Sequence, residues 1–533
     1  MYLKGNLMSD QLHKKSILKK TFQVGGNTLV SRFLGLAREI LLMRFLGVGV
    51  VADAFTTAFM IPNSLRKLFA EGALTAAFVP TFVTLFHKGG KEKANELMSL
   101  AFLFFEGLLL ALCVLVVWQP EYTITLIAPG FSSEQLAATI PCLRILMPFI
   151  FFISTSSLLA GALQSVNQFF IPAFCPVLLN ITFIGGILAC LAYGLSVEYL
   201  CYAILFGGFL QIVLHVISYF SLGFSFKMPT METTHSFLQM LTKFLFCFLS
   251  MSVMELSLII DQRFASYLAV GSVTLIKYTS RFMGIPLGVF AVAFSTILLP
   301  HFSKVNLIDP KRLHFYLAES MKFVFWVTIP ATIIMGYLSE NIFVTLFVSS
   351  SKKFPVALIP EAGHLLLAFL MGLFFFSINK ILFNLYYSFH DTRYPMIIAA
   401  AATVMNVGAN YLLVGSLGTI GLALGTCISG ITQTVLSLFF LKYKHNFELH
   451  LKEFFEFALR YSIQLIIVLL PLYWGYKAVH QAVIHACGTS TKATFFFIES
   501  FGFWLWTMPL IASAFGVLYI TRKQFKVQLY FLD

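Results

Sequence analysis

Long apolar segments recur along the chain, and short polar stretches separate them. A helix needs about 20 residues to cross the hydrocarbon core of a bilayer, and breaks at Gly or Pro are tolerated there. By this measure the pattern predicts an all-α polytopic membrane protein with about fourteen transmembrane helices. The expected spans are 20–47, 50–68 with a helical continuation to 87, 94–118, 136–165, 172–194, 199–221, 238–268, 271–299, 313–338, 358–388, 394–414, 419–441, 454–476 and 496–520.

Basic residues are distributed unevenly between the loops. If the basic N-terminus lies in the cytoplasm, basic residues recur in the loops and the tail on that side: His87, Lys88, Lys91 and Lys93; Lys227 and Lys243; Lys304, Lys311 and Arg312; Arg393; Lys442, Lys444 and Lys452; and Arg522, Lys523 and Lys526. The opposite loops near 119–135, 195–198, 269–271 and 415–418 carry none, and the exceptions on that side are Lys352, Lys353, Lys477 and Lys492. This asymmetry predicts an even number of spans with both termini in the cytoplasm.

The chain also contains a weak internal repeat. FVPTF at 78–82 resembles LLPHF at 298–302, and Arg44-Phe45 resembles Arg263-Phe264, so that the copies are separated by about 220 residues. Same-sense repeats of six spans predict two lobes, as in many transporters. The expected domains are a cytoplasmic N-terminal segment at 1–19, a first lobe at 20–225 (spans 1–6), a second lobe at 226–445 (spans 7–12), and spans 13 and 14 with a cytoplasmic tail at 446–533.

Composition supports the membrane assignment and narrows the function. Of the 533 residues, 59% are hydrophobic and only 11% are charged, whereas soluble domains carry about 25% charged residues. A net charge of +13 would suggest nucleic acid as a partner in a soluble protein, but the basic loops explain it here, and no nucleic acid is expected. The eight cysteines are scattered without a CxxC pair, so we expect them to be reduced and not to bind metal.

Arginines are concentrated where lipid-facing residues would be expected. The apolar stretch at 31–80 contains Arg32, Arg38 and Arg66. An ionisable group at bilayer depth costs about 3 kcal/mol or more, so it normally faces a cavity or a partner. Because guanidinium groups bind phosphate bidentately, several arginines predict a cationic cavity for a phosphate or diphosphate. The alternative is snorkelling near a span end, which fits Arg44 and Lys67 better than Arg32 and Arg38.

Asp53 is an acid that we expect to lie deep in this stretch. It could hold one of the arginines in a structural ion pair, or it could act directly on the substrate or on a proton. An ion pair that an anionic ligand breaks would make Asp53 a gate.

The predicted second lobe carries its own polar residues within apolar segments. Arg281 again lies near a proline, and Asp261 could pair with Arg263 on the same span. Four residues offer hard oxygen ligands of the kind that Na⁺ prefers: Asp261, Asn406, Asn410 and Thr426. Taken singly, Asn and Thr more often form hydrogen bonds between helices.

Two segments resemble a known family. The stretch SRFLGLARE…ADAFTTAF…PNSLRKLFAEGALTAAFVP at 31–80 is similar to the MurJ/MviN lipid II flippases of bacterial peptidoglycan synthesis, and ASYLAVGSVTLIKYTSRFMGIPLGVFAVAFSTILLPHFSK at 265–304 resembles the same family. The resemblance implies a fourteen-helix fold of the multidrug/oligosaccharidyl-lipid/polysaccharide exporter superfamily. In that fold two six-helix lobes enclose a central cationic cavity, and the last two helices form a groove for the lipid tail.

The resemblance also implies roles for particular residues. Headgroup binding would fall to Arg32, Arg38, Arg66 and Arg281, and gating or coupling to Asp53. A sodium site would be formed by Asp261, Asn406, Asn410 and Thr426. The sequence departs from the family pattern at Ser280 and Asn410, where acids are expected, and this affects the charge balance near Arg281 and the ligand set for the metal.

The function that the resemblance implies is translocation of lipid II, the undecaprenyl-diphosphate-linked peptidoglycan precursor, from the cytoplasmic to the periplasmic leaflet by alternating access. The expected location is the bacterial inner membrane. The expected partners are lipid II and membrane lipids, and contacts with other cell-wall synthesis proteins would fit this role. No cofactor is expected beyond a Na⁺ or H⁺ coupling ion.

Three alternatives remain open at the level of sequence. One is a flippase for another undecaprenyl-linked glycan, and a second is a cation-coupled multidrug antiporter, for which an acidic cavity would be expected. A third is an integral-membrane enzyme acting on lipid-linked sugars. The sequence contains no HExxH, Walker or GxSxG motif, so we expect a transporter and not an enzyme.

Overall fold

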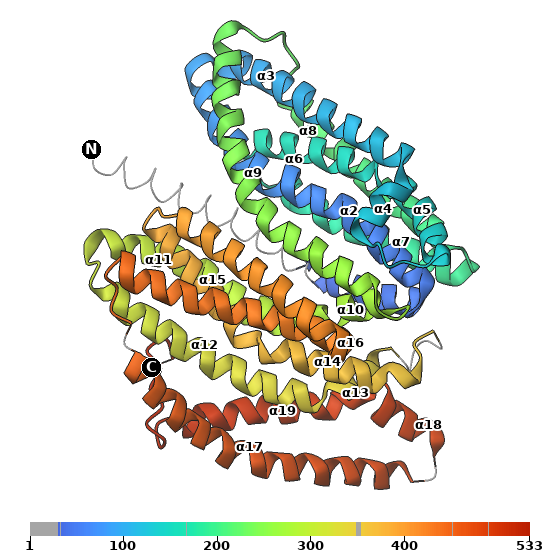
Figure 1. Cartoon of the computed structure of the whole chain (residues 1–533), viewed down its shortest axis with the longest axis vertical. Coiled ribbons are helices and arrows are strands. Elements are labelled where there is room, and N and C mark those ends of the chain that lie inside the picture. The colour runs from blue at the N-terminus through green and yellow to red at the C-terminus, as the bar shows by residue number, and fades with distance from the viewer. Residues whose placement is uncertain are drawn as a thin grey trace, which may run out of the picture. The chain divides into compact units, whose positions relative to one another are not determined.

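The computed structural model describes residues 30–31, 33–166, 168–347, 353–449, 451–488 and 490–532. All regular structure within these residues is helical (Figure 1). The chain divides into two compact units, Met1–Ile259 and Ile260–Asp533, and the boundary falls inside one long helix, α9 (Met231–Ser266). We call them unit 1 and unit 2.

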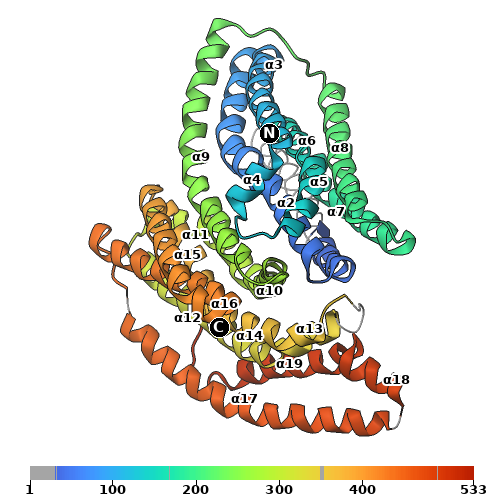
Figure 2. The same ribbon diagram turned by 45° about the vertical axis from the view of Figure 1, so that its right-hand side comes forward.

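Unit 1 begins, within the described residues, with a helix that includes 33–46. Its further elements are α2 (Val50–Arg66), the π-helix η1 (Lys67–Gly72), α3 (Ala73–Trp118), α4 (Pro120–Ile127), α5 (Ser133–Leu146), α6 (Phe149–Ser165), α7 (Phe170–Tyr193), α8 (Val197–Ser221) and most of α9. α6 packs against both α3 and α8, α7 packs against α8, and α2 packs against α5 (Figures 1 and 2).

Unit 2 contains a comparable series of helices. Its elements are α10 (Ser272–Pro286), the π-helix η2 (Leu287–Val292), α11 (Ala293–Ile308), α12 (Arg312–Tyr337), α13 (Ser339–Leu346), the 3-10 turn η4 (Val356–Leu358), α14 (Ile359–Met371), α15 (Leu373–Ser388), α16 (Arg393–Lys444), α17 (Leu451–Cys487), α18 (Thr491–Thr494), the π-helix η5 (Phe495–Glu499) and α19 (Gly502–Thr521). α17 runs beside α19, and α12 packs against α14, α15 and α17 (Figure 2).

Local sequence signals account for several helix ends. Pro120 occupies the first turn of α4, where its missing N–H costs nothing. Ser132 and Gln135 form a capping box at the start of α5. Gly418 has φ 55° and ψ −128°, a conformation that is readily adopted only by glycine, and it bends α16 in the middle.

The order of elements repeats between the units. In each unit an α-helix leads through a π-helical segment into the next helix, as α2–η1–α3 and as α10–η2–α11. The two π-helices begin at Lys67 and Leu287, a separation of about 220 residues that matches the sequence repeat.

Eleven helices in the described residues are long and apolar enough to cross a membrane. α16 contains two predicted spans, because only the bend at Gly418 separates them, and the predicted span at 20–47 is described only in part. The predicted span at 271–299 is divided, since α10 ends at Pro286 and η2 leads into α11. The all-helical, membrane-spanning class is confirmed, whereas the number fourteen stays a prediction.

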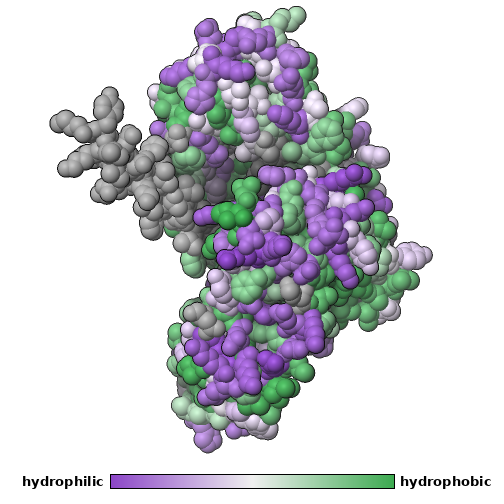
Figure 3. Space-filling model, turned by 90° about the vertical axis from the view of Figure 1, so that its left-hand side faces the viewer, coloured by the Kyte–Doolittle hydropathy of each residue, from purple (hydrophilic) through white to green (hydrophobic). Residues whose placement is uncertain are grey.

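Each unit has an apolar interior rich in aromatic rings. In unit 1, Phe55, Phe149 and Phe183 belong to one buried cluster. A second cluster in that unit contains Phe82 and Phe105. The view toward the starts of α12 and α17 shows large hydrophilic areas beside hydrophobic ones (Figure 3).

The segment after α19 folds back onto unit 2. Val527 and Leu529 are buried. The backbone N–H of Tyr530 donates to Glu319 of α12 at 3.0 Å, and the ring of Phe531 lies 5.1 Å from that of Phe294 of α11. Residues 522–532 therefore connect the end of α19 to α11 and α12.

Candidate functional site

Arg38 is connected to α7 by a polar contact inside unit 1. Its Nη1 donates to Oδ1 of Asn180 at 2.9 Å. The Asn180 amide in turn donates to the backbone oxygen of Ser31 at 3.1 Å and to its hydroxyl at 3.2 Å. Residues 31 and 38 lie about two turns apart on one helix face, so a single amide of α7 joins both.

Two further contacts hold the Arg38 guanidinium. Nη2 lies 2.7 Å from a carboxylate oxygen of Glu39, and the side chain of Arg38 is 19% exposed. The guanidinium carbon lies 4.9 Å from the centre of the Phe183 ring, within cation–π range. An amide, an acid and a ring therefore fix this cation at a position that solvent still reaches.

Arg66 lies at the end of α2, one turn after Pro62. Its Nε and Nη2 both donate to Oδ1 of Asn63, at 3.2 Å and 3.0 Å. Its charge also interacts with those of Arg38 and Glu255. Arg66 and Arg38 therefore belong to one electrostatic group.

The neighbouring residue Lys67, the first of η1, binds an acid of α9. Lys67 Nζ lies 2.9 Å from Oε1 of Glu255, whose residue is 8% exposed, while the Lys67 side chain is 37% exposed. A buried acid thus has a half-exposed cation as its partner.

These five residues form what we call the unit 1 cationic cluster: Arg38, Glu39, Arg66, Lys67 and Glu255. Three cations and two acids leave one positive charge in excess. Charge-assisted and bidentate hydrogen bonds to guanidinium groups are the strongest means by which a protein binds phosphate. The cluster can therefore bind an anion with phosphate or carboxylate chemistry.

Asp53 has a different environment. It is fully buried in the first turn of α2, where a negative charge is favourable. The Gln135 side chain donates to it at 3.1 Å, and Gln135 also belongs to the capping box of α5. Asp53 thus connects the starts of α2 and α5, and its predicted gating or coupling role stays a prediction.

Two predicted headgroup residues are not part of the cluster as described. Arg32 lies outside the described residues. Arg281 lies on α10 in unit 2, five residues before Pro286, and is exposed. Both assignments stay predictions.

The predicted sodium ligands partly meet in unit 2. The Asn410 amide nitrogen donates to Asp261 at 2.7 Å and to Asn406 at 3.1 Å. The Thr426 hydroxyl donates to the backbone oxygen of Leu422 at 3.0 Å. Asp261 therefore has Asn410 as a partner, and its pairing with Arg263 stays a prediction.

The ligand set fits a small cation in one respect. The Asn410 side-chain oxygen is buried and has no hydrogen-bond partner, although its nitrogen has two. Oxygen and nitrogen of an amide exchange places when the group turns by half a rotation. After that turn, oxygens of Asp261, Asn406 and Asn410 would all face one point.

Four contributing residues were not predicted from the sequence or were left there without a role: Glu39, Asn63, Asn180 and Glu255. Asn180 is the only side-chain amide in the apolar run FIPAFCPVLLNITF, and an amide within a span was a usable signal. The contacts of Asn63 and Glu255 depend on the end of α2 and on the packing of α9, which hydropathy does not reveal.

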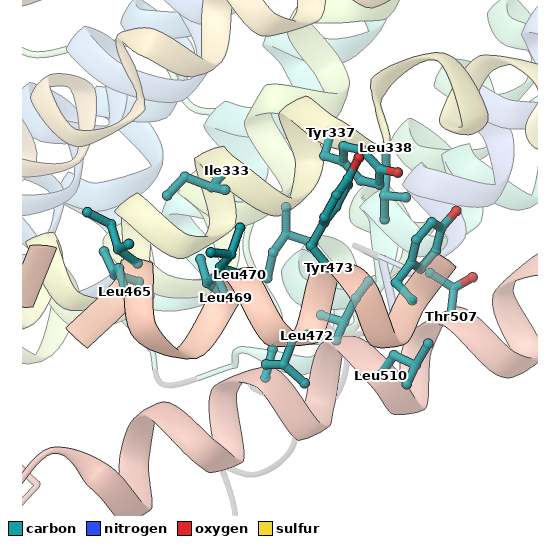
Figure 4. A pocket seen from close by; sticks show the side chains of 15 residues that line it. Ile333, Tyr337, Leu338, Leu465, Leu469, Leu470, Leu472, Tyr473, Thr507 and Leu510 are labelled. Carbon is teal, nitrogen blue, oxygen red and sulfur yellow. The ribbon is translucent and has the colours of Figure 1, made fainter. Parts of the chain in front are cut away.

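An apolar cavity of about 390 Å³ lies between α12, α17 and α19 in unit 2 (Figure 4). Its lining includes Ile333 from α12, Leu338 between α12 and α13, Leu465 and Leu469 from α17, and Leu510 from α19. Tyrosines and one threonine supply the few polar groups. A cavity of this lining suits a hydrocarbon chain.

Comparisons with known proteins identify the family of this chain. The family model described as lipid II flippase MurJ matches residues 42–488. A probable lipid II flippase MurJ of Rhizobium tropici is 31% identical over 443 residues, which are 81% of this chain and 82% of that protein. A lipid II flippase MurJ of Burkholderia cenocepacia is 30% identical over 78% of this chain and 83% of its own length.

Solved structures support the same relationship. A lipid II flippase MurJ in an inward closed conformation matches with a TM-score of 0.76 and 27% identity, over 94% of this chain and 99% of that one. An inward-facing MATE family multidrug transporter of the MOP superfamily matches at 16% identity with a TM-score of 0.62, over 77% of this chain and 93% of its own, which shows a shared fold only. With a family model over most of its length and relatives above 30% identity, the chain belongs to the lipid II flippase MurJ family.

Proposed function

We propose that this protein translocates lipid II from the cytoplasmic to the periplasmic leaflet of the bacterial inner membrane, with both termini in the cytoplasm. The observation that carries the proposal is the unit 1 cationic cluster, in which a held Arg38 and a neighbouring Arg66 lie among membrane-spanning helices. Membership of the family supports the choice of lipid II among phosphate-bearing lipids.

The cluster would bind the diphosphate of the headgroup. Arg66 now donates to the neutral oxygen of Asn63, which a phosphate oxygen can replace as the stronger acceptor. Arg38 would keep its hydrogen bond to Asn180 while other N–H groups of its guanidinium turn toward the ligand. Arg32 and Arg281 would add further donors, and alternating access would expose the site to each side in turn.

The undecaprenyl chain would stay in an apolar environment. The cavity between α12, α17 and α19 supports this assignment, because its lining is almost entirely hydrocarbon (Figure 4). Transport of this kind leaves the substrate chemically unchanged. The excess of positive charge in the cluster also favours an anionic cargo over a cationic drug.

A coupling ion completes the proposal. Asp261, Asn406 and Asn410 would hold Na⁺, with Thr426 nearby on α16, and the ion would supply a positive charge that offsets the carboxylate. The unpartnered oxygen of Asn410 supports this set.

Complementation tests the function directly. Cells depleted of their own lipid II flippase should regain growth and lipid II translocation when they express this chain. The R38A variant should lose at least about tenfold in translocation rate, because a charged hydrogen bond is worth about 1.5–3 kcal/mol. R460A is the matched control, since Arg460 forms only an exposed pair with Glu456 on α17.

The same assay in proteoliposomes, with Na⁺ replaced by choline, examines the coupling ion. The sodium site would be supported if wild type translocates lipid II more slowly in choline than in Na⁺, and if the D261N variant shows the same rate in both. Equal rates for R38A and wild type, or failure of wild type to translocate lipid II, would contradict the proposed function. Recovery of chemically altered lipid II would point to an enzyme instead.

A further inference from the structure

Glu106 is a carboxylic acid inside the apolar interior of unit 1. It lies on α3 within a stretch long and apolar enough to cross a membrane, and it is 3% exposed. Neither carboxyl oxygen has a hydrogen-bond partner in the described residues. Its neighbours in sequence include Phe105, a fully buried core residue.

The groups that face Glu106 are neutral hydroxyls. Ser154 and Thr155 of α6 adjoin the carboxyl closely enough to interact with it. Both hydroxyl oxygens are buried and, like the carboxyl, form no hydrogen bond in this geometry. A hydroxyl both donates and accepts, so Ser154 and Thr155 can donate to a carboxylate and can accept a hydrogen bond from the protonated acid.

The charged residues on the helices around α3 do not balance Glu106. α6 carries no titratable residue. Glu121 of α4, Glu134 and Arg144 of α5, and Lys243 of α9 are exposed. Lys67 of η1 is bound to Glu255. An ionised carboxylate in such surroundings is far costlier than the neutral acid, so the buried group is held with its proton.

The polar groups continue on the other side of α6. Ser154, Thr155 and Ser156 are consecutive and therefore point in three directions around the helix, toward both α3 and α8, which pack against it. The Ser156 hydroxyl lies 2.8 Å from Nδ1 of His215 of α8. Two titratable groups, Glu106 and His215, thus lie on either side of a run of hydroxyls.

We infer that Glu106, with the hydroxyls of Ser154 and Thr155, is a proton-binding site whose occupancy is coupled to transport. The carboxylate takes up one proton to form the neutral acid, which donates to a hydroxyl of α6, and it returns that proton to water in another conformation. His215 is the next titratable group along the hydroxyl run. The coupling part of this inference rests on the proposed function, whereas proton binding does not.

Infrared spectroscopy of the purified full-length protein tests proton binding without substrate. Wild type should show the C=O stretch of a buried protonated carboxyl at neutral pH, and E106Q should lose that band. E121Q is the matched control, because Glu121 is an exposed acid close in sequence. The double variant S154A–T155V keeps the carboxyl and should shift the band by removing its acceptors, which provides a second readout if E106Q folds poorly.

Transport at several pH values, in proteoliposomes loaded with lipid II and with equal Na⁺ concentrations on both sides, tests the coupling. One coupled proton gives a rate that changes by up to about tenfold per pH unit. Wild type and E121Q should show this dependence, and E106Q should show a flat profile.

Persistence of the band in E106Q, or its absence in wild type, would overturn the site. A pH profile unchanged in E106Q would overturn the coupling. A wild type that keeps the band but moves no lipid II would overturn the proposed function and the coupling with it, while still establishing proton binding at Glu106.

Discussion

At the scale of single residues, the environment of Arg38 shows how a cation is accommodated among membrane-spanning helices. Glu39 supplies the opposite charge, Phe183 a ring face, and Asn180 a neutral acceptor that is itself tied to Ser31. Each contact restricts the orientation of the guanidinium, so the side chain loses little conformational entropy when a ligand binds.

Asn180 should therefore act as a positioning residue. We expect N180L to lower lipid II translocation by about tenfold, because Arg38 loses a hydrogen bond worth about 1.5–3 kcal/mol and a fixed direction. The rate in proteoliposomes measures this effect. T182V is the control on the same helix, since the Thr182 hydroxyl bonds only to backbone oxygens of α7. If N180L translocates as fast as T182V, Asn180 only connects helices.

The sequence predicts which charged residues of this site need partners, but it does not predict which residues those partners are. The burial cost of a charge shows that Arg38 and Arg66 need partners. It cannot name Asn180, Asn63 or Glu255, because those contacts depend on how helices distant in sequence pack. The assignment of Asp261, Asn406 and Asn410 to one place came from the family resemblance, and their close contact agrees with it.

At the scale of elements, irregular backbone lies where hydropathy shows only a continuous apolar run. The predicted span at 271–299 contains the end of α10, all of η2 and the start of α11. Hydropathy measures the polarity of side chains, so it carries no information about a change from α- to π-helical hydrogen bonding in the backbone. The break between the predicted spans 394–414 and 419–441, by contrast, coincides with the bend of α16 at Gly418.

The bend at Gly418 gives a prediction about stability. We expect G418A to lower the free energy of unfolding by about 1–3 kcal/mol, since an L-residue at φ 55° and ψ −128° is strained even though a Cβ would meet open space. G415A is the control three residues earlier, where a Cβ also meets open space without the positive φ. Thermal unfolding in detergent compares the two, and a melting temperature of G418A equal to that of G415A would exclude backbone strain.

At the scale of the whole molecule, each unit contains a charged side chain that binds an amide side chain of another helix, and the charge is of opposite sign in the two units. In unit 1, Arg38 on the first helix binds an amide of α7. In unit 2, Asp261 on α9 binds an amide of α16. A cation in one unit and an acid in the other suit an anionic cargo and a cationic coupling ion, which is the division of roles that the proposed transport requires.

The cavity of unit 2 offers a test of tail binding. Ala514 lines it and is 4% exposed, so A514W should fill much of its volume of about 390 Å³. We expect photocrosslinking by an undecaprenyl-phosphate analogue to fall severalfold in A514W, because the chain loses its apolar site. S513W is the control, since the adjacent Ser513 is exposed. Equal crosslinking in both variants would place the tail elsewhere.

The π-helical segment η1 also constrains how this sequence can change in length over evolution. Each residue of an α-helix advances the following residues by about 100°. Loss of a single residue between Lys67 and Gly72 would therefore turn the start of α3 about its axis and move Phe78 and Phe82 away from the interior. Insertions and deletions that a surface loop absorbs should thus be rare here, and a stretch of constant length should mark η1 in aligned relatives.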